Sequence, residues 1–100
     1  MRLPERLRDP IKTALRDTFG DVPVYLFGSR ADDTKKGGDI DLAVATEIGK
    51  SEFRSKKIQF LTKMARKNVE IHIDLVQLDV RTDPLLKNEI QAAGILWESE

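Results

Sequence analysis

Two short groups of residues in the first half of the chain have the types and the spacing of a site for chemistry on phosphates. Gly28 and Ser29 follow an apolar run, and Asp39 and Asp41 open a second one. A Gly-Ser turn can present backbone N–H groups and a hydroxyl to a phosphate. Two carboxylates at alternate positions of a strand point to the same face and can share a divalent cation. Together the two groups predict metal-dependent chemistry on a nucleoside triphosphate.

A third carboxylate, Asp74, completes the predicted cluster. It lies in a later apolar run, between two aliphatic residues. Because alternate residues of a strand face opposite sides, burial of the aliphatic residues sends Asp74 to the same side as Asp39 and Asp41. Carboxylates packed together repel each other, and Mg²⁺ removes that penalty. The alternative is that Asp39 and Asp41 are solvated residues at the end of a strand.

The residues of the Gly-Ser turn each have a structural alternative. Gly28 allows a backbone conformation or a close approach that a side chain would block. Ser29 offers a hydroxyl and N–H donors to an anion, or is simply the cap of a helical turn. Arg30 either balances phosphate charge or is a solvated helix residue. The chain has no glycine-rich loop followed by Lys-Ser or Lys-Thr, so a Walker-type phosphate loop is not indicated.

Composition limits the class of protein. One hundred residues, 40% of them hydrophobic, predict a single small globular domain over residues 1–100. Seventeen basic and seventeen acidic side chains cancel, so the net charge does not predict binding to nucleic acid or membranes. The absence of cysteine excludes disulfides and thiolate zinc sites. No signal peptide or membrane span is apparent, and we expect a soluble cytoplasmic protein.

The elements that must position these residues follow from periodicity and from helix start and stop signals. Asp-Pro pairs at 9–10 and 83–84 predict helix starts, and Gly20 and Gly94 predict helix ends. In chain order we predict a helix over 10–19, a strand over 22–27, a helical turn over 29–33, a strand over 39–45, a helix over 51–67, a strand over 69–78, a helix over 84–93 and a short edge strand over 95–98. This order predicts an α/β (α+β) fold, a small mixed β-sheet with helices packed on one face.

Apolar positions at helical spacing predict which residues of each helix face the sheet. For the first helix these are Ile11, Ala14, Leu15, Thr18 and Phe19; for the second Ile58, Leu61, Met64 and Ala65; for the third Leu86, Ile90 and Ala93. The second helix also carries six cations between Arg54 and Lys67, with no acidic residue among them. They form either a docking surface for an acidic partner or RNA, or a solvated helix face. His72, the single histidine, lies either beside the site or on a half-exposed strand.

The combined motifs resemble the DNA polymerase β-like nucleotidyltransferase superfamily. The residues that carry the resemblance are Gly28-Ser29-Arg30, the strand start Asp39-Ile40-Asp41-Leu42, and Asp74. The chain is similar to the minimal nucleotidyltransferase (MNT) branch, and within it to the MntA antitoxins encoded beside HEPN-domain toxins. The resemblance implies the polymerase β-like fold and nucleotidyl transfer. It further implies that Asp39, Asp41 and Asp74 hold two Mg²⁺ ions, and that Gly28 and Ser29, with Arg30 beside them, hold the triphosphate of ATP.

The acceptor of the nucleotide is also implied by the resemblance. A chain of one hundred residues has little room for a separate acceptor domain. In the MntA-like group the partner is a HEPN ribonuclease toxin, which is silenced by transfer of AMP from ATP to a tyrosine. Two alternatives remain: an antitoxin that masks its partner without catalysis, and nucleotidyl transfer to a small molecule or RNA.

Overall fold

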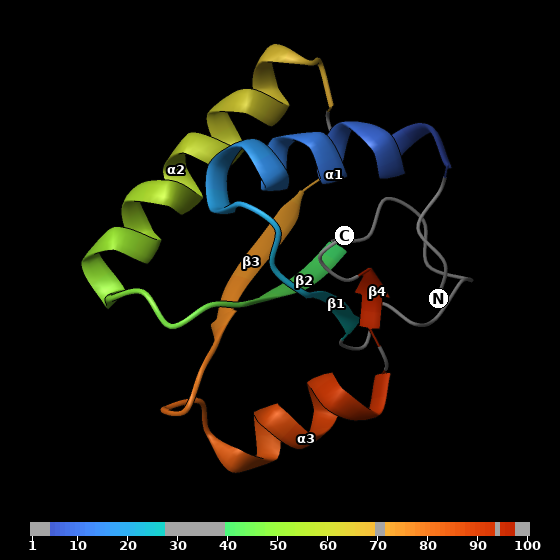
Figure 1. The fold of residues 1–100 in the computed structure, drawn as a ribbon. Coiled ribbons are helices and arrows are strands. Elements are labelled where there is room, and N and C mark those ends of the chain that lie inside the picture. The colour runs from blue at the N-terminus through green and yellow to red at the C-terminus, as the bar shows by residue number, and fades with distance from the viewer. Residues whose placement is uncertain (1–4, 28–39, 70–71, 94, 98–100) are drawn as a thin grey trace.

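Three helices and four strands make up the part of the chain that the structure describes, residues 5–27, 40–69, 72–93 and 95–97 of a computed structural model (Figure 1). In order they are α1 (Glu5–Phe19), β1 (Val24–Phe27), β2 (Ile40–Ala45), α2 (Lys50–Arg66), β3 (Ile73–Leu78), α3 (Pro84–Ala93) and β4 (Ile95–Trp97). The predicted order of elements is confirmed within these residues. The predicted helical turn over 29–33 lies outside them.

The four strands form one mixed sheet in the order β3-β2-β1-β4. β1 pairs antiparallel with both β2 and β4, whereas β2 and β3 are parallel. Parallel neighbours need a crossover connection, and α2 provides it. The predicted mixed sheet and its short C-terminal edge strand are therefore confirmed.

The two faces of the sheet have separate apolar cores. On one face, Ile40, Leu42 and Val44 pack with side chains from α1 and α2. On the other face, Ala43 and Leu78 pack with Ile90 of α3. Figure 1 shows α1 and α2 on one side of the sheet and α3 on the other.

The prediction that the helices pack on one face thus holds for α1 and α2 and is corrected for α3. The second face is apolar along much of its length, because Tyr25, Phe27, Ala45 and Val76 also lie on it. An apolar sheet face has to be covered, and α3 covers it. The apolar residues of that face, and not its carboxylates, are the feature of the sequence that indicates a covering helix.

Two helices begin earlier than predicted. α1 begins at Glu5 and contains Pro10, although a proline inside a helix removes one backbone hydrogen bond. The helix extends before Pro10 because Leu7, only 6% exposed, packs into the core one turn earlier. α2 begins at Lys50, one residue before the predicted start, and has Gly49 as its N-cap.

Two other boundary signals are confirmed. Gly20 ends α1 with φ of 84°, in the left-handed region that favours glycine, and its N–H donates to the Arg16 carbonyl at 2.9 Å. Asp83 caps α3, where its Oδ2 accepts from the N–H groups of Leu85 at 3.1 Å and Leu86 at 3.4 Å. The predicted inner residues Leu86 and Ile90 do pack against the sheet, whereas the side chain of Ala93 lies outside the description.

The prediction of which residues of α2 face the core is largely wrong. Of the four residues predicted, Met64 alone is buried. Ile58 is 60% exposed and Leu61 is 37% exposed, while Phe53 and Phe60 face the core. The two phenylalanines lie two turns apart and bury more apolar area than the aliphatic residues. None of the described helices is long and apolar enough to cross a membrane.

Candidate functional site

Two of the six predicted site residues, Asp41 and Asp74, lie among the residues that the structure describes. Gly28, Ser29, Arg30 and Asp39 lie outside them. The structure therefore shows where two of the three predicted carboxylates lie, one on β2 and one on β3.

Asp41 of β2 and Asp74 of β3 are directly opposite each other in the parallel register. Neighbouring strands lie about 4.8 Å apart, and residues paired in this way point to the same face. That face is the one opposite to Ile40, Leu42 and their core. The two carboxylates thus lie side by side, as strand alternation predicts, while their catalytic roles remain a prediction.

The position along the strands leaves this pair accessible. Asp41 and Asp74 are each the second residue of their strand, whereas α3 packs farther along, over Ala43 and Leu78. Asp41 is half-buried, and the Asp74 side chain is 53% exposed. The same sheet face is therefore part of the core at one end and open at the end that carries the carboxylates.

Lys57 of α2 is a neighbour of the site that the sequence analysis did not place. Its Nζ lies 4.0 Å from Oδ1 of Asp74. Both side chains are partly exposed, so the pair contributes little to stability. The cation instead sets the charge next to Asp74. The run of cations in this helix is apparent in the sequence. The sequence does not show which of them lies next to Asp74, because the alignment of α2 with β3 depends on tertiary packing.

His72 lies just before β3 and is exposed. Its carbonyl accepts a hydrogen bond from the Ile40 N–H at 2.9 Å, which joins the beginnings of β2 and β3. The backbone of His72 therefore helps to hold the two strands in the register that pairs Asp41 with Asp74.

The donor atoms of Asp41 and Asp74 fit a hard divalent cation. Mg²⁺ is held in proteins by one or two carboxylates together with substrate phosphates and water, and the pair supplies two carboxylates at neighbouring positions. Among the described residues, which do not include Asp39, no group of three His, Asp or Glu side chains could hold a metal ion. That the pair is part of a metal site, with Asp39 as a third ligand, remains a prediction.

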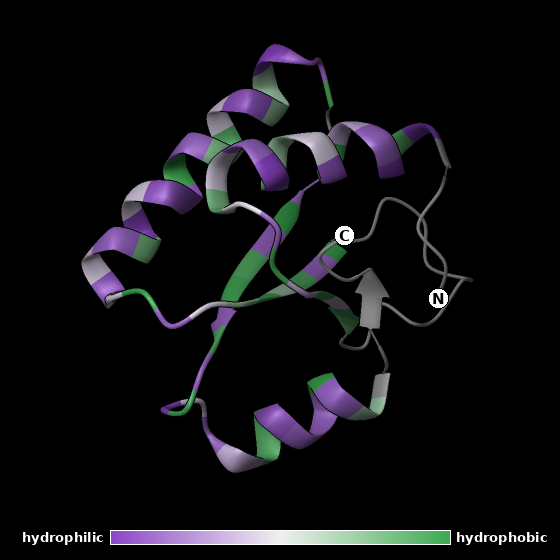
Figure 2. Cartoon of the chain, viewed as in Figure 1, coloured by the Kyte–Doolittle hydropathy of each residue, from purple (hydrophilic) through white to green (hydrophobic). Residues whose placement is uncertain are grey.

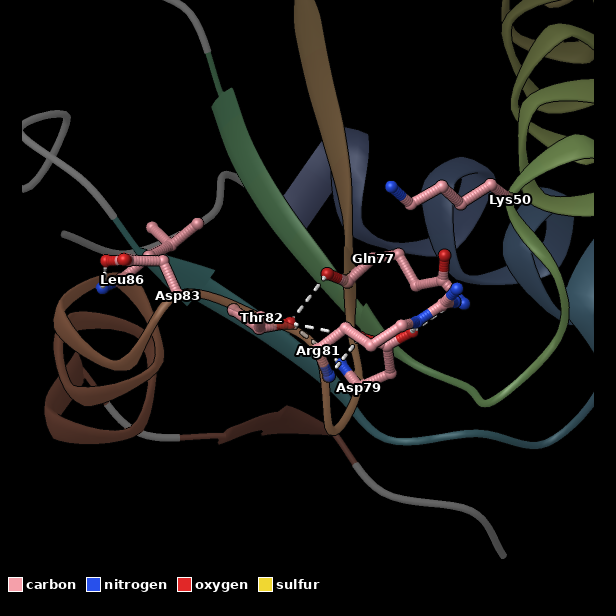
Figure 3. Close-up of a pocket in the computed structure, with 7 residues that line it drawn as sticks. All are labelled: Lys50, Gln77, Asp79, Arg81, Thr82, Asp83 and Leu86. Atoms are coloured by element: carbon pink, nitrogen blue, oxygen red, sulfur yellow. Dashed lines mark hydrogen bonds and ion pairs between the residues drawn. The ribbon is translucent and has the colours of Figure 1, made fainter.

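A second polar cluster lies at the other end of β3, around the buried carboxylate of Asp79. Figure 3 shows this carboxylate among the residues that line a hollow of about 230 Å³: Lys50, Gln77, Asp79, Arg81, Thr82, Asp83 and Leu86. Oδ2 of Asp79 accepts from Nη2 of Arg81 at 2.7 Å and from Nε at 3.2 Å, and Oδ1 accepts from the Arg81 backbone N–H at 3.0 Å.

The hydrogen bond from the Arg81 side chain holds the pKa of the Asp79 carboxyl below its usual range. Thr82 Oγ1 also accepts from the Asp79 N–H at 2.9 Å. These contacts use the carboxylate oxygens to close the turn between β3 and α3. We therefore interpret this cluster as a structural turn, separate from the candidate site.

Fold and site together define a small α/β domain with paired carboxylates at the beginnings of two parallel strands. The model of one protein family, described as Polymerase beta, Nucleotidyltransferase, matches residues 10–99. Because this match covers most of the chain, the protein belongs to the polymerase β nucleotidyltransferase family. No curated protein matches the chain. The predicted class of enzyme, a nucleotidyltransferase with the polymerase β-like fold, is thereby confirmed.

Proposed function

We propose that this nucleotidyltransferase transfers AMP from ATP to a tyrosine hydroxyl of a partner HEPN ribonuclease toxin and so acts as its antitoxin. The family match supports nucleotidyl transfer. The observation that carries a catalytic role is the in-register pair of Asp41 and Asp74. The nucleotide, the tyrosine and the toxin rest on the resemblance of the motifs to the MntA-like group.

The proposed reaction is an in-line displacement at the α-phosphate. The acceptor oxygen forms a bond to the α-phosphorus, the bond from that phosphorus to the bridging oxygen breaks, and pyrophosphate leaves. Asp74 receives the proton of the acceptor hydroxyl. Asp41 and Asp74, with Asp39, would hold Mg²⁺, which when bound lowers the pKa of the acceptor and neutralises charge on the phosphates.

We assign the triphosphate to Gly28, Ser29 and Arg30, which lie between β1 and β2 in the sequence. Gly28 allows close approach of the backbone, Ser29 donates from its hydroxyl and N–H, and Arg30 balances negative charge. The exposure of Asp74 supports an acceptor that belongs to another molecule, because a hydroxyl can reach this carboxylate from solvent.

Incubation of the chain with its cognate partner, ATP and Mg²⁺ should add AMP to the partner, measured by intact-protein mass spectrometry. We expect Asp74→Asn to slow labelling by roughly 10²- to 10⁴-fold, the usual contribution of a group that transfers the proton. Asp41→Asn should have a comparable effect, and Asp39→Ala combined with Asp41→Ala should abolish labelling. Chelation of the metal should stop the reaction of the wild type.

A matched control is Asp17→Asn, which changes an exposed carboxylate of α1 and should leave labelling unchanged. Absence of labelling with a verified partner would refute the enzymatic proposal. Neutralisation of the toxin that survives the loss of Asp39 and Asp41 would instead support an antitoxin that acts by masking.

A further inference from the structure

Three cations of α2 form a row along one side of the helix. Lys50, Arg54 and Lys57 are spaced by four and three residues, so they project from the same side. Together with Phe53 and Gln77 they line a hollow of about 250 Å³, and no carboxylate lines it. No ion pair joins Lys50 or Arg54 to another residue in the described part of the chain. Lys50 and Arg54 of this cationic row therefore present positive charge that the described residues do not neutralise, whereas Lys57 is paired with Asp74.

The cationic row ends at the candidate site. At its first end Lys50 shares a hollow with Gln77, and at its last end Lys57 lies 4.0 Å from Asp74. Seven helical residues span about 10 Å, which equals the length of the three strand residues from Asp74 to Gln77. The row thus follows β3, the outer strand of the described sheet, toward the carboxylate pair.

Two exposed aliphatic side chains adjoin the cationic row. Ile58 follows Arg54 by four residues, and Leu61 follows Lys57 by four, so each lies next to a cation on the helix surface. Ile58 is 60% exposed and Leu61 is 37% exposed. Hydrophobic and hydrophilic bands alternate along α2 in Figure 2. Apolar contacts flanked by charge are typical of a protein-binding surface.

The positive charge is concentrated on α2 and is not a property of the whole chain. α2 contains six basic residues and one acidic residue, which gives 6 − 1 = +5, whereas the net charge of the whole chain is zero. An acidic partner would therefore be drawn to this helix rather than to the molecule in general. Single-stranded RNA is bound by stacking on aromatic side chains, but the exposed apolar residues that adjoin these cations, Ile58 and Leu61, are aliphatic.

We propose that the cationic row, together with Ile58 and Leu61, docks an acidic and partly apolar segment of the protein acceptor. Docking along β3 directs the acceptor hydroxyl to Asp74. This inference rests on the proposed function, because it assigns to that site a substrate class, a protein with an acidic segment beside the modified hydroxyl. Ion pairs to Lys50 and Arg54 supply the attraction, and burial of Ile58 and Leu61 supplies apolar contact.

Fluorescence anisotropy tests the docking directly, without ATP or metal. The probe is a fluorescein-labelled peptide of alternating Glu and Leu residues that contains one Tyr. The wild-type chain should bind the peptide, and added salt should weaken binding. Arg54→Glu should weaken binding about tenfold, because it replaces an attraction with a repulsion. Ile58→Ser should weaken it about threefold through lost apolar contact.

The matched control is Arg66→Glu, the same charge reversal at an exposed position of α2 that does not line the hollow. It should change the affinity by less than about twofold. Circular dichroism of each variant verifies that the helix is retained. Equal affinities for wild type, Arg54→Glu and Ile58→Ser would overturn the proposal, as would tighter binding of oligouridylate that is lost in Arg54→Glu.

The docking and the proposed function can fail separately. A chain that binds the peptide through Arg54 but transfers no AMP to its partner refutes the proposed function and supports the docking surface. A chain that labels its partner at the same rate after Lys50→Glu and Arg54→Glu supports the proposed function and overturns the docking surface.

Discussion

Thr18 brings a hydroxyl into an apolar environment. The residue is only 6% exposed and lies on the inner side of α1, and its Oγ1 makes no hydrogen bond to the residues that the structure describes. Its backbone carbonyl, in contrast, accepts from Nζ of Lys56 at 3.0 Å, which joins α1 to α2. This hydrogen bond between the helices therefore uses the backbone of Thr18 and not its hydroxyl.

Thr18→Val should raise the free energy of unfolding by about 1 kcal/mol, because it removes a buried polar group that lacks a partner and retains the branched shape. Urea unfolding followed by circular dichroism measures the change. Thr62→Val is the matched control in α2, since its hydroxyl is exposed and donates to the Ile58 carbonyl at 2.9 Å. It should be neutral or slightly destabilising. A loss of stability in Thr18→Val would show that the hydroxyl has a stabilising role.

Strand alternation was sufficient to predict that Asp41 and Asp74 share a face, because both strands carry aliphatic residues on either side of the carboxylate. It could not predict that Lys57 approaches Asp74. That contact depends on the rotation of α2 about its axis and on its position along β3, which are set by packing of large side chains.

At the scale of an element, α2 has two apolar stripes, and the larger side chains determine which stripe faces the core. Phe60 is fully buried, and Phe53 packs its ring against Phe19 of α1 with centroids 5.5 Å apart. The aliphatic stripe that includes Ile58 is turned outward as a result. Periodicity alone identified the helix but not its inner face, because the apolar residues form two adjacent stripes, one with the phenylalanines and one with Ile58 and Leu61.

Phe60→Ala should lower the free energy of unfolding by about 3–5 kcal/mol, since it leaves a cavity where α2 meets the core. Ile58→Ala in the same helix should change it by less than about 0.5 kcal/mol, because the side chain is exposed. Thermal and urea unfolding of the two variants measure how much each side chain contributes to the free energy of unfolding. A greater loss for Ile58→Ala than for Phe60→Ala would contradict the orientation of α2.

At the scale of the whole molecule, the order and the types of the elements could be predicted because the periodicity of the segments agreed with the boundary signals at Gly20 and Asp83. The layers could not be predicted fully. Whether α3 joins α1 and α2 or covers the second face depends on the turn after β3, which Asp79, Arg81 and Thr82 close. Nothing in the local pattern of α3 fixes that direction.

Stability of the molecule should depend on pH through Asp79. Its pKa is lower in the folded state than in the unfolded state, chiefly because of the hydrogen bond from the Arg81 side chain. Between these two values the unfolded chain binds more protons, so stability falls as pH decreases. The contribution is fully present above the ordinary carboxyl value of about 4 and is lost as pH falls through the folded-state value.

Asp79→Asn should therefore be less stable than the wild type at neutral pH and should approach it in acid. Urea unfolding at a series of pH values measures the difference. Arg81→Ala should give the same trend, because it removes the cation that lowers the pKa. A difference between wild type and Asp79→Asn that is constant with pH would exclude this role of the carboxylate.

The parallel pairing of β2 and β3 has a consequence for biosynthesis. Asp41 meets Asp74 only after α2 has crossed the sheet, so the carboxylate pair is a long-range contact that a growing polypeptide cannot form until β3 has left the ribosome. The N-terminal half of the chain therefore carries Asp41 through synthesis without the strand that pairs with it. The carboxylate pair arises in the same folding event as the pairing of β2 with β3.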